Sequence, residues 1–303
     1  MTVAVLGPGG VGGLVAGALD HADTPVTLVA RESTAELIAA RGLLVSSVRL
    51  GDFVAHPRAV ASLEEPVEAL VVATKATGLH EALERIAASP ALVVPLLNGL
   101  DHLAVLRERF GEQTVVAGTI RVEADRPEPG VVVHTSPFLR IDMASAHAAA
   151  RPGMEALAEK LEAAGIPARV EESEPQVLWG KLVRLNALAC TTSAFDKLLG
   201  EILTTPELRA ELVGAIEEGC AVAAAEGASI DAADPLGELS AAHSTLGSSM
   251  QRDIAAGRPP ELDAIPGAVL RAAARHGVEC PTIERLVGTI AMRVGVPAPI
   301  PPG

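Results

Sequence analysis

The sequence predicts an α/β domain with a doubly wound parallel sheet, followed by an all-α domain. Two observations carry this prediction. Apolar runs of strand length, such as residues 69–74 and 91–97, alternate with helical segments in the first part of the chain. After about Ser173 these runs vanish, and long alanine- and leucine-rich helical patterns replace them. We therefore expect one domain over residues 1–172 and a second over residues 173–303.

The first domain is expected to alternate strands and helices. Residues 43–60 show strand-like alternation around a Gly-Asp turn, which predicts a hairpin excursion. A late antiparallel addition is expected from residues 131–137 and 139–143. The remaining predicted strands are residues 3–6, 26–30, 69–74, 91–97 and 167–172, and the clearest helices are residues 11–19 and 151–166.

The second domain is expected to be a set of helices separated by glycine and proline. No internal repeat is visible, and the final VPAPIPPG segment, residues 296–303, is predicted to be a tail without a core of its own. The expected helix breaks are Gly200, Gly227, Pro235, the turn at 257–260, Gly277 and Pro281.

Composition excludes several classes of protein. A net charge of −14 argues against general nucleic-acid binding, which depends on lysine and arginine. No uninterrupted apolar run is long enough for a membrane helix, and the start lacks the pattern of a secretory signal. Cys190, Cys220 and Cys280 are far apart, so neither a disulfide frame nor a metal site is predicted. These features favour the cytoplasm.

A glycine-rich loop lies near the start of the chain. Gly7, Gly9 and Gly12 form G-x-G-x-x-G between a predicted strand and a predicted helix. Gly7 permits a tight turn, Gly9 lets a pyrophosphate approach the backbone, and Gly12 lets the helix pack against the strand. The N–H groups at the helix start, including those of Gly10 and Val11, favour phosphate. The pattern predicts a Rossmann-type dinucleotide site, although a strand–helix turn without ligand would also use glycine.

The end of the second strand bears on which dinucleotide binds. Arg31 follows this strand, and a guanidinium there suits the 2′-phosphate of NADP. Ser33 could add a hydroxyl. Glu32 is a competing signal, because an acid at this place serves the ribose of NAD. We favour NADP over NAD, and a solvated arginine without ligand remains the alternative.

Four further stretches resemble a known family. They are VATKATG (72–78), LLNGLD (96–101), LWGKLVRLNALACTTS (178–193) and SSMQRDIAAGRPPELDAIPG (248–267). Together with the opening loop, they resemble the ketopantoate reductases (2-dehydropantoate 2-reductases) over almost the whole chain. The resemblance implies NADPH-dependent reduction of a 2-oxo acid, with ketopantoate as the default substrate and a place in pantothenate biosynthesis.

The resemblance also implies roles for individual residues. Lys181 would be the general acid that protonates the oxo oxygen, and Glu261 would hold a substrate hydroxyl near it. Ser249 would bind the substrate carboxylate, Asn98 would bridge cofactor and substrate, and Lys75 would line the same cleft. Each has a structural alternative. Lys181 would be a surface lysine, and Glu261 a glutamate at a helix start. Ser249 would face solvent, Asn98 would lie in a turn, and Lys75 would lie in a loop. His102 and His134 are weak candidates for acid–base roles.

The chain departs from the family pattern after Lys181. Ketopantoate reductases usually carry asparagines four and eight residues after this lysine, where the present chain has Leu185 and Ala189. Residues spaced by four share a helix face, so Asn186 is not expected to replace them. Loss of two amides would penalise the hydroxyl of ketopantoate. We therefore expect that the substrate could be less polar.

Alternative functions remain open at this stage. An NADPH-binding redox sensor would bind cofactor without turnover, and an imine or opine-type reductase would require an amine. A helical domain rich in alanine and leucine is compatible with a homodimer, but it serves a monomer's core equally well.

Overall fold

The structure is a computed structural model, and it describes residues 1–299; part of the predicted tail, residues 300–303, lies outside this range. The chain forms two compact units. The first comprises residues 1–97 and 102–177, and the second comprises residues 98–101 and the chain from Leu178 onward. The predicted fold class, an α/β Rossmann-type domain followed by a helical domain, is confirmed.

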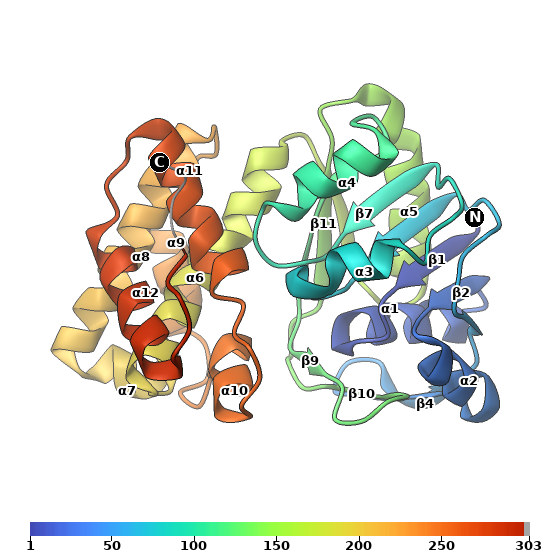
Figure 1. The fold of residues 1–303 in the computed structure, drawn as a ribbon, viewed down its shortest axis with the longest axis horizontal. Coiled ribbons are helices and arrows are strands. Elements are labelled where there is room, and N and C mark those ends of the chain that lie inside the picture. Colours follow the sequence, from blue (N-terminus) through green and yellow to red (C-terminus); the bar gives the residue numbers. More distant parts are fainter. Residues whose placement is uncertain (300–303) are drawn as a thin grey trace. The chain divides into compact units, whose positions relative to one another are not determined.

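The first unit is organised around a five-stranded parallel sheet with the order β5-β2-β1-β6-β7. Apart from Thr27, the strands β1, β2, β6 and β7 consist of apolar residues, all of them buried, as expected for strands covered on both faces. Figure 1 shows α3 and α4 over the near face of this sheet. The strands are β1 (Val3–Leu6), β2 (Val26–Val29), β5 (Arg58–Val60), β6 (Ala69–Val72) and β7 (Leu92–Pro95).

Helices connect these strands and cover the sheet. Alternate residues of β1, β2, β6 and β7 share one hydrophobic core with α1 and α5. The helices of this unit are α1 (Gly10–His21), α2 (Glu32–Arg41), α3 (Leu79–Leu83), α4 (His102–Phe110) and α5 (Arg151–Ala163), with short 3₁₀ turns η1 (Ala76–Gly78) and η2 (Ala148–Ala150).

Two smaller sheets complete the first unit. The hairpin predicted over residues 43–60 is present, since β3 and β4 pair antiparallel. The last part of that range, β5, is not part of the hairpin and pairs parallel with β2. Both strands of the expected late antiparallel addition are present, but they belong to different sheets. β10 pairs antiparallel with β9 and parallel with β3, whereas β11 pairs antiparallel with β8 and parallel with β12. The strands are β3 (Leu43–Ser47), β4 (Gly51–Ala55), β8 (Ala117–Arg121), β9 (Ala124–Asp125), β10 (Val131–His134), β11 (Arg140–Ala144) and β12 (Ala168–Glu171).

The second unit is helical in its described residues. Gly227, Gly257 and Gly277 follow helix ends with positive φ, as predicted. Gly200 and Pro235 do not break helices, because each lies in the first turn or two of a new one. The helices are α6 (Glu174–Phe195), which begins in the first unit, α7 (Leu199–Thr204), α8 (Pro206–Ala225), α9 (Ala233–Ser240), α10 (Ser249–Ala255), η3 (Asp263–Gly267), α11 (Ala268–His276) and α12 (Pro281–Val294).

Within residues 1–299, none of the helices has the length and apolar character required to cross a bilayer.

Candidate functional site

The glycine loop forms the turn between β1 and α1. Gly7 has a φ of 104°, a conformation that favours glycine, and its N–H donates to the carbonyl oxygen of Val29 at 3.0 Å. A Cβ on Gly12 would overlap the carbonyl oxygen of Gly7 and approach the Cβ of Ala73. Gly7 and Gly12 are therefore required by the packing of this strand–turn–helix unit itself.

Gly9 differs from its neighbours. It has an ordinary extended backbone, and the nearest atom to an added Cβ is the carbonyl oxygen of Ala73, 3.9 Å away. By contrast, a Cβ on Gly10 would overlap the backbone of Ala124. The protein's own packing therefore explains glycine at 7, 10 and 12 but not at 9. A ligand that approaches the backbone there would explain it.

The start of α1 suits a phosphate group. Gly9 is the N-cap and supplies no side-chain acceptor to the first N–H groups of α1. Close by, at the end of β6, Thr74 presents a buried hydroxyl oxygen without a hydrogen-bond partner among the described residues, and its Cγ2 lies 3.0 Å from the Cβ position of Gly7. These features fit a dinucleotide. Thr74 was not singled out from the sequence, since a single strand-end threonine carries no signal.

Arg31 lies directly after β2, at the N-cap position of α2. Its side chain is 72% exposed, and its Nη2 donates to Oε2 of Glu81 on α3 at 3.2 Å. Glu81 also pairs with Arg85 at 3.5 Å. The competing acid, Glu32, is the first residue of α2 and is exposed. Arg31 is therefore accessible to a 2′-phosphate, beside a carboxylate that competes for it.

Lys75 follows β6 and is exposed at the start of the 3₁₀ turn η1. It belongs to the first unit together with the glycine loop, whereas Asn98, Lys181, Ser249 and Glu261 belong to the second.

Lys181, Asn98 and Glu261 come together in the second unit. Nζ of Lys181 donates to Oδ1 of Asn98 at 2.9 Å, and Nδ2 of Asn98 donates to Oε2 of Glu261 at 3.1 Å. Lys181 and Glu261 are buried, and Asn98 is partly buried. An ammonium can only donate and a carboxylate can only accept, so the two neighbours fix the orientation of the amide.

These three residues come from three separate elements. Lys181 lies in the first half of α6, Asn98 follows β7, and Glu261 precedes the π-helical turn η3. Residues that are far apart in the sequence thus form one small polar cluster: Lys181, Asn98 and Glu261. We call this cluster the catalytic trio, after the role proposed for it below. A buried ammonium held by a neutral amide is arranged to give a proton to an acceptor placed against it.

Ser249 is the first residue of α10 and is half-buried. Its neighbour Ser248 caps this helix by accepting from the N–H of Gln251 at 3.0 Å. Ser248 also accepts from the hydroxyl of Thr192 on α6 at 2.8 Å, which ties the start of α10 to the helix of Lys181. The structure thus fixes the backbone that carries Ser249, without bringing that residue into the catalytic trio.

The two positions that depart from the family pattern differ in accessibility. Leu185 is partly buried against the helical core, whereas Ala189 is fully buried within it. Asn186 is also fully buried, and its Oδ1 accepts from the thiol of Cys190 at 3.5 Å. Burial raises the pKa of Cys190 to about 12, so this thiol stays protonated. Of Leu185, Ala189 and Asn186, Leu185 alone keeps part of its side chain exposed.

Both ring nitrogens of His134 make hydrogen bonds within the fold, which indicates a structural role. Its ring nitrogens bond Ser47 at 2.8 Å and Ser136 at 3.1 Å, and it is buried.

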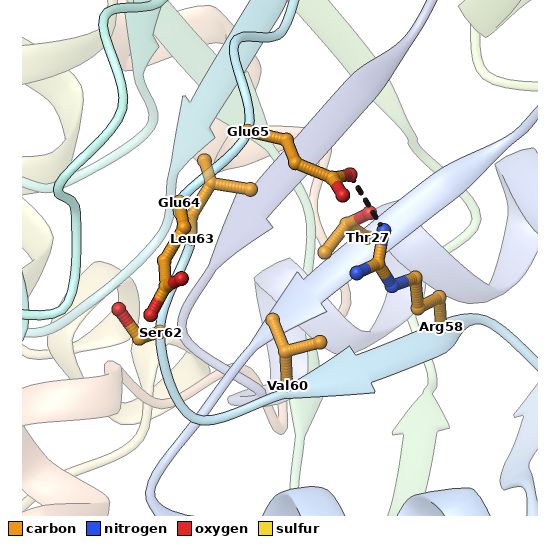
Figure 2. Close-up of a pocket in the computed structure, with 7 residues that line it drawn as sticks. All are labelled: Thr27, Arg58, Val60, Ser62, Leu63, Glu64 and Glu65. Carbon is orange, nitrogen blue, oxygen red and sulfur yellow. Dashed lines mark hydrogen bonds and ion pairs between the residues drawn. The ribbon is translucent and has the colours of Figure 1, made fainter.

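A small pocket of about 120 Å³ lies over β2 and β5 (Figure 2). It contains none of the residues expected to be functional, and Arg58 beside it is neutralised by Glu65 at 2.9 Å. No cluster of three or more metal-ligating side chains occurs in the part of the chain that the structure describes.

A glycine loop between strand and helix in an α/β unit, with a lysine-centred trio in a helical unit, fits the class of oxidoreductases that act on CH–OH groups with NADP, and the comparisons show that class. Comparison with family models is more specific. The model "Ketopantoate reductase PanE/ApbA" matches residues 3–146, and "Ketopantoate reductase PanE/ApbA C terminal" matches residues 175–294. The chain belongs to the ketopantoate reductase family.

Known proteins agree with this assignment. A 2-dehydropantoate 2-reductase of Mycobacterium tuberculosis is 30% identical, and the match covers 95% of this chain and 96% of the relative. The crystal structure of 2-dehydropantoate 2-reductase from Geobacter metallireducens has a TM-score of 0.88 at 26% identity, covering 97% of this chain and 100% of the other. A ternary structure of D-mandelate dehydrogenase with NADH and anilino(oxo)acetate has the same fold, with a TM-score of 0.86 at 20% identity over 97% and 99% of the two chains.

Proposed function

We propose that this protein reduces a 2-oxo acid to the 2-hydroxy acid with NADPH, and that Lys181 supplies the proton. The observation that carries the proposal is the catalytic trio, in which a buried lysine donates to Asn98 and Asn98 donates to Glu261. Such an arrangement suits proton donation to a carbonyl oxygen. Membership of the ketopantoate reductase family supports the same chemistry.

The chain's residues divide the work as follows. The pyrophosphate is held by Gly7, Gly9, Gly10, Val11 and Gly12. Arg31 favours the phosphorylated cofactor, and Lys75 lines the cofactor cleft. The chemistry that a bound NADPH would supply is the hydride for the carbonyl carbon. Lys181 transfers a proton from Nζ to the carbonyl oxygen. Asn98 holds the ammonium in place, Glu261 accepts from the substrate or from Asn98, and Ser249 donates to the substrate carboxylate.

Ketopantoate is the default substrate of the family, but Leu185 favours a less polar one. An apolar side chain one turn beyond Lys181 cannot bond the hydroxyl of ketopantoate. An unsatisfied polar group costs about 1–3 kcal/mol, which corresponds to roughly a 5- to 150-fold loss. The D-mandelate dehydrogenase structure, which contains anilino(oxo)acetate, illustrates that this fold holds an oxo acid with an apolar substituent.

A matched pair of substrates tests both parts of the proposal. Ketopantoate and 3,3-dimethyl-2-oxobutanoate differ by one hydroxyl, so their kcat/KM ratio measures what that group contributes. We expect the compound without the hydroxyl to be favoured in the natural protein, and Leu185→Asn to move the ratio toward ketopantoate. The variant Lys181→Ala should lose turnover of both while it keeps its affinity for NADPH.

The outcomes separate the remaining functions. Tight NADPH binding without turnover of any 2-oxo acid would support a redox sensor instead of an enzyme. Turnover that requires an added amine would support an imine or opine-type reductase. Unchanged turnover in Lys181→Ala would remove this lysine from the mechanism. A homodimer and a cytoplasmic location remain predictions, which gel filtration and cell fractionation would test.

A further inference from the structure

The segment that carries Asn98 packs against helical residues of the second unit. Residues 98–101 are grouped by their contacts with the second unit, although the chain on both sides of them belongs to the first. Gly99 has a φ of 84°, and a Cβ there would overlap the carbonyl oxygen of Ala264 in η3. The backbone after Asn98 is therefore seated directly on the turn that follows Glu261.

Arg271 ties the same two segments together through its side chain. From α11, its Nη2 donates to Oδ2 of Asp101 at 2.5 Å and to the carbonyl oxygen of Asp263 at 2.9 Å. Its Nη1 donates to Oδ1 of Asp263 at 2.7 Å. One guanidinium thus binds both the loop of Asn98 and the turn η3. We call this set the Arg271 clamp: Arg271, Asp101 and Asp263.

The burial of Arg271 and the packing beside it agree with a rigid arrangement of the three side chains of the Arg271 clamp. Only 20% of the Arg271 side chain is exposed, whereas the side chains of Asp101 and Asp263 are 51% and 77% exposed, so the guanidinium is the shielded partner in these hydrogen bonds. Gly267 lies beside the clamp, and a Cβ there would stand 3.1 Å from Oδ1 of Asp263 and 3.2 Å from Nη1 of Arg271. Glycine at this place leaves the arginine and the carboxylate room to meet.

The clamp connects directly to the catalytic trio. Asp101 lies three residues after Asn98, and Asp263 lies two residues after Glu261. The turn η3 is π-helical: the N–H of Gly267 reaches the carbonyl oxygen of Leu262 at 3.1 Å, and the widened turn is followed at once by α11. Movement of either segment would pull on one end of the amide bridge between Lys181 and Glu261.

We propose that Arg271 is a positioning residue for the reduction, because it fixes Asn98 between Lys181 and Glu261 by binding Asp101 and Asp263. This proposal rests on the proposed function of the trio. Arg271 itself touches none of the three residues in the contacts given above. Its effect is on the placement of Asn98, and small misplacements of such groups cost up to about 100-fold in rate.

Three variants test the role of Arg271. Arg271→Met removes the guanidinium at similar length, and Arg271→Lys keeps the charge without the forked donors. Arg275→Met is the matched control, since Arg275 lies one turn further along α11 and pairs with Glu226 at 2.9 Å. We expect kcat to fall about 10- to 100-fold in Arg271→Met, with partial recovery in Arg271→Lys. The Kd for NADPH should remain within about two-fold.

Two readouts distinguish positioning from a general structural role. If Asn98 moves, Lys181 loses an acceptor that stabilises its charged form, so the alkaline limb of the kcat profile should move to lower pH. Hydrogen exchange of a peptide covering residues 98–101 should also quicken several-fold in Arg271→Met, but not in Arg275→Met. The exchange measurement does not depend on turnover.

The possible failures are distinguishable. If the natural protein reduces no 2-oxo acid, the proposed function fails, and the exchange experiment alone decides whether the clamp holds the loop. If the natural protein is active and Arg271→Met matches Arg275→Met in kcat, pH profile and exchange, Arg271 has no positioning role and the proposal is overturned.

Discussion

The ammonium of Lys181 donates to the amide oxygen of Asn98 across a distance of 2.9 Å, and the same amide donates its N–H to Glu261. Asparagine is well suited to this place because it offers an acceptor to a cation and a donor to a carboxylate at the same time. Alanine offers neither, and aspartate offers only acceptors.

The first prediction concerns this amide. Asn98→Ala and Asn98→Asp should both lower kcat, but their pH profiles should move in opposite directions. Alanine removes an acceptor from Lys181, so the alkaline limb of kcat should move to lower pH. Aspartate adds a negative charge beside the ammonium, so the limb should move to higher pH. Parallel shifts in the two variants would contradict the bridging role.

The second prediction separates two glycines of the loop. A Cβ on Gly12 would overlap backbone, whereas a Cβ on Gly9 has no atom nearer than 3.9 Å. Gly12→Ala should therefore lower the melting temperature of the protein without cofactor, by an amount that corresponds to about 2 kcal/mol or more. Gly9→Ala should leave the melting temperature nearly unchanged and weaken NADPH binding. A folded Gly9→Ala protein with natural affinity would argue against a pyrophosphate at this place.

The third prediction concerns the neighbour of Arg31. Glu81 accepts from Arg31 and so competes with a 2′-phosphate for the guanidinium. Because the pair is well exposed, its contribution is small, and Glu81→Gln should tighten NADPH binding only about two- to five-fold. The Kd for NADH should change less, and the difference should shrink as salt is added. Glu84→Gln, at the end of the same helix, is the control; an equal change there would indicate a general charge effect.

The fourth prediction follows from His134. Burial lowers the pKa of His134 below its ordinary value of 6.5. On acidification the unfolded chain therefore takes up a proton at higher pH than the folded protein. The free energy of unfolding should fall as the pH drops below about 6.5, with a slope of at most about 1.4 kcal/mol per pH unit from this group.

Urea unfolding at pH 7.5 and 5.5 measures this effect, with His134→Gln as the reference that cannot titrate. The natural protein should lose more stability than the variant over this interval. Equal losses would show that His134 does not contribute, and would place the pH dependence on other groups.

The local features of the fold were predictable from the sequence. The β1–loop–α1 unit was predictable because the glycine spacing and the flanking apolar runs act over a dozen neighbouring residues. The strands that pair with β5 and β10 were not predictable, since alternation indicates a strand but not the strand beside it. Gly200 illustrates a further limit: glycine weakens a helix by about 1 kcal/mol, which tertiary packing readily overcomes.

The candidate site was predictable in its members but not in its geometry. Lys181, Asn98 and Glu261 were identified through family resemblance, and they are separated by 83 and 163 residues along the chain. No local sequence pattern indicates that the amide of Asn98 lies between the charged groups of Lys181 and Glu261. The Arg271 clamp left no signal either, because arginine and aspartate are common on exposed helices. Thr74 became a candidate only when its hydroxyl proved to be buried without a partner.

The grouping of residues 98–101 with the helical unit has a consequence for how the protein can be divided. A gene fragment that starts at Leu178 would encode most of that unit, yet it would lack the amide beside Lys181 and Asp101, one of the two carboxylates bound to Arg271. Separately expressed halves would have to recover those four residues from the other fragment. The helical unit therefore depends on a short segment encoded within the first unit, even though each unit has its own core.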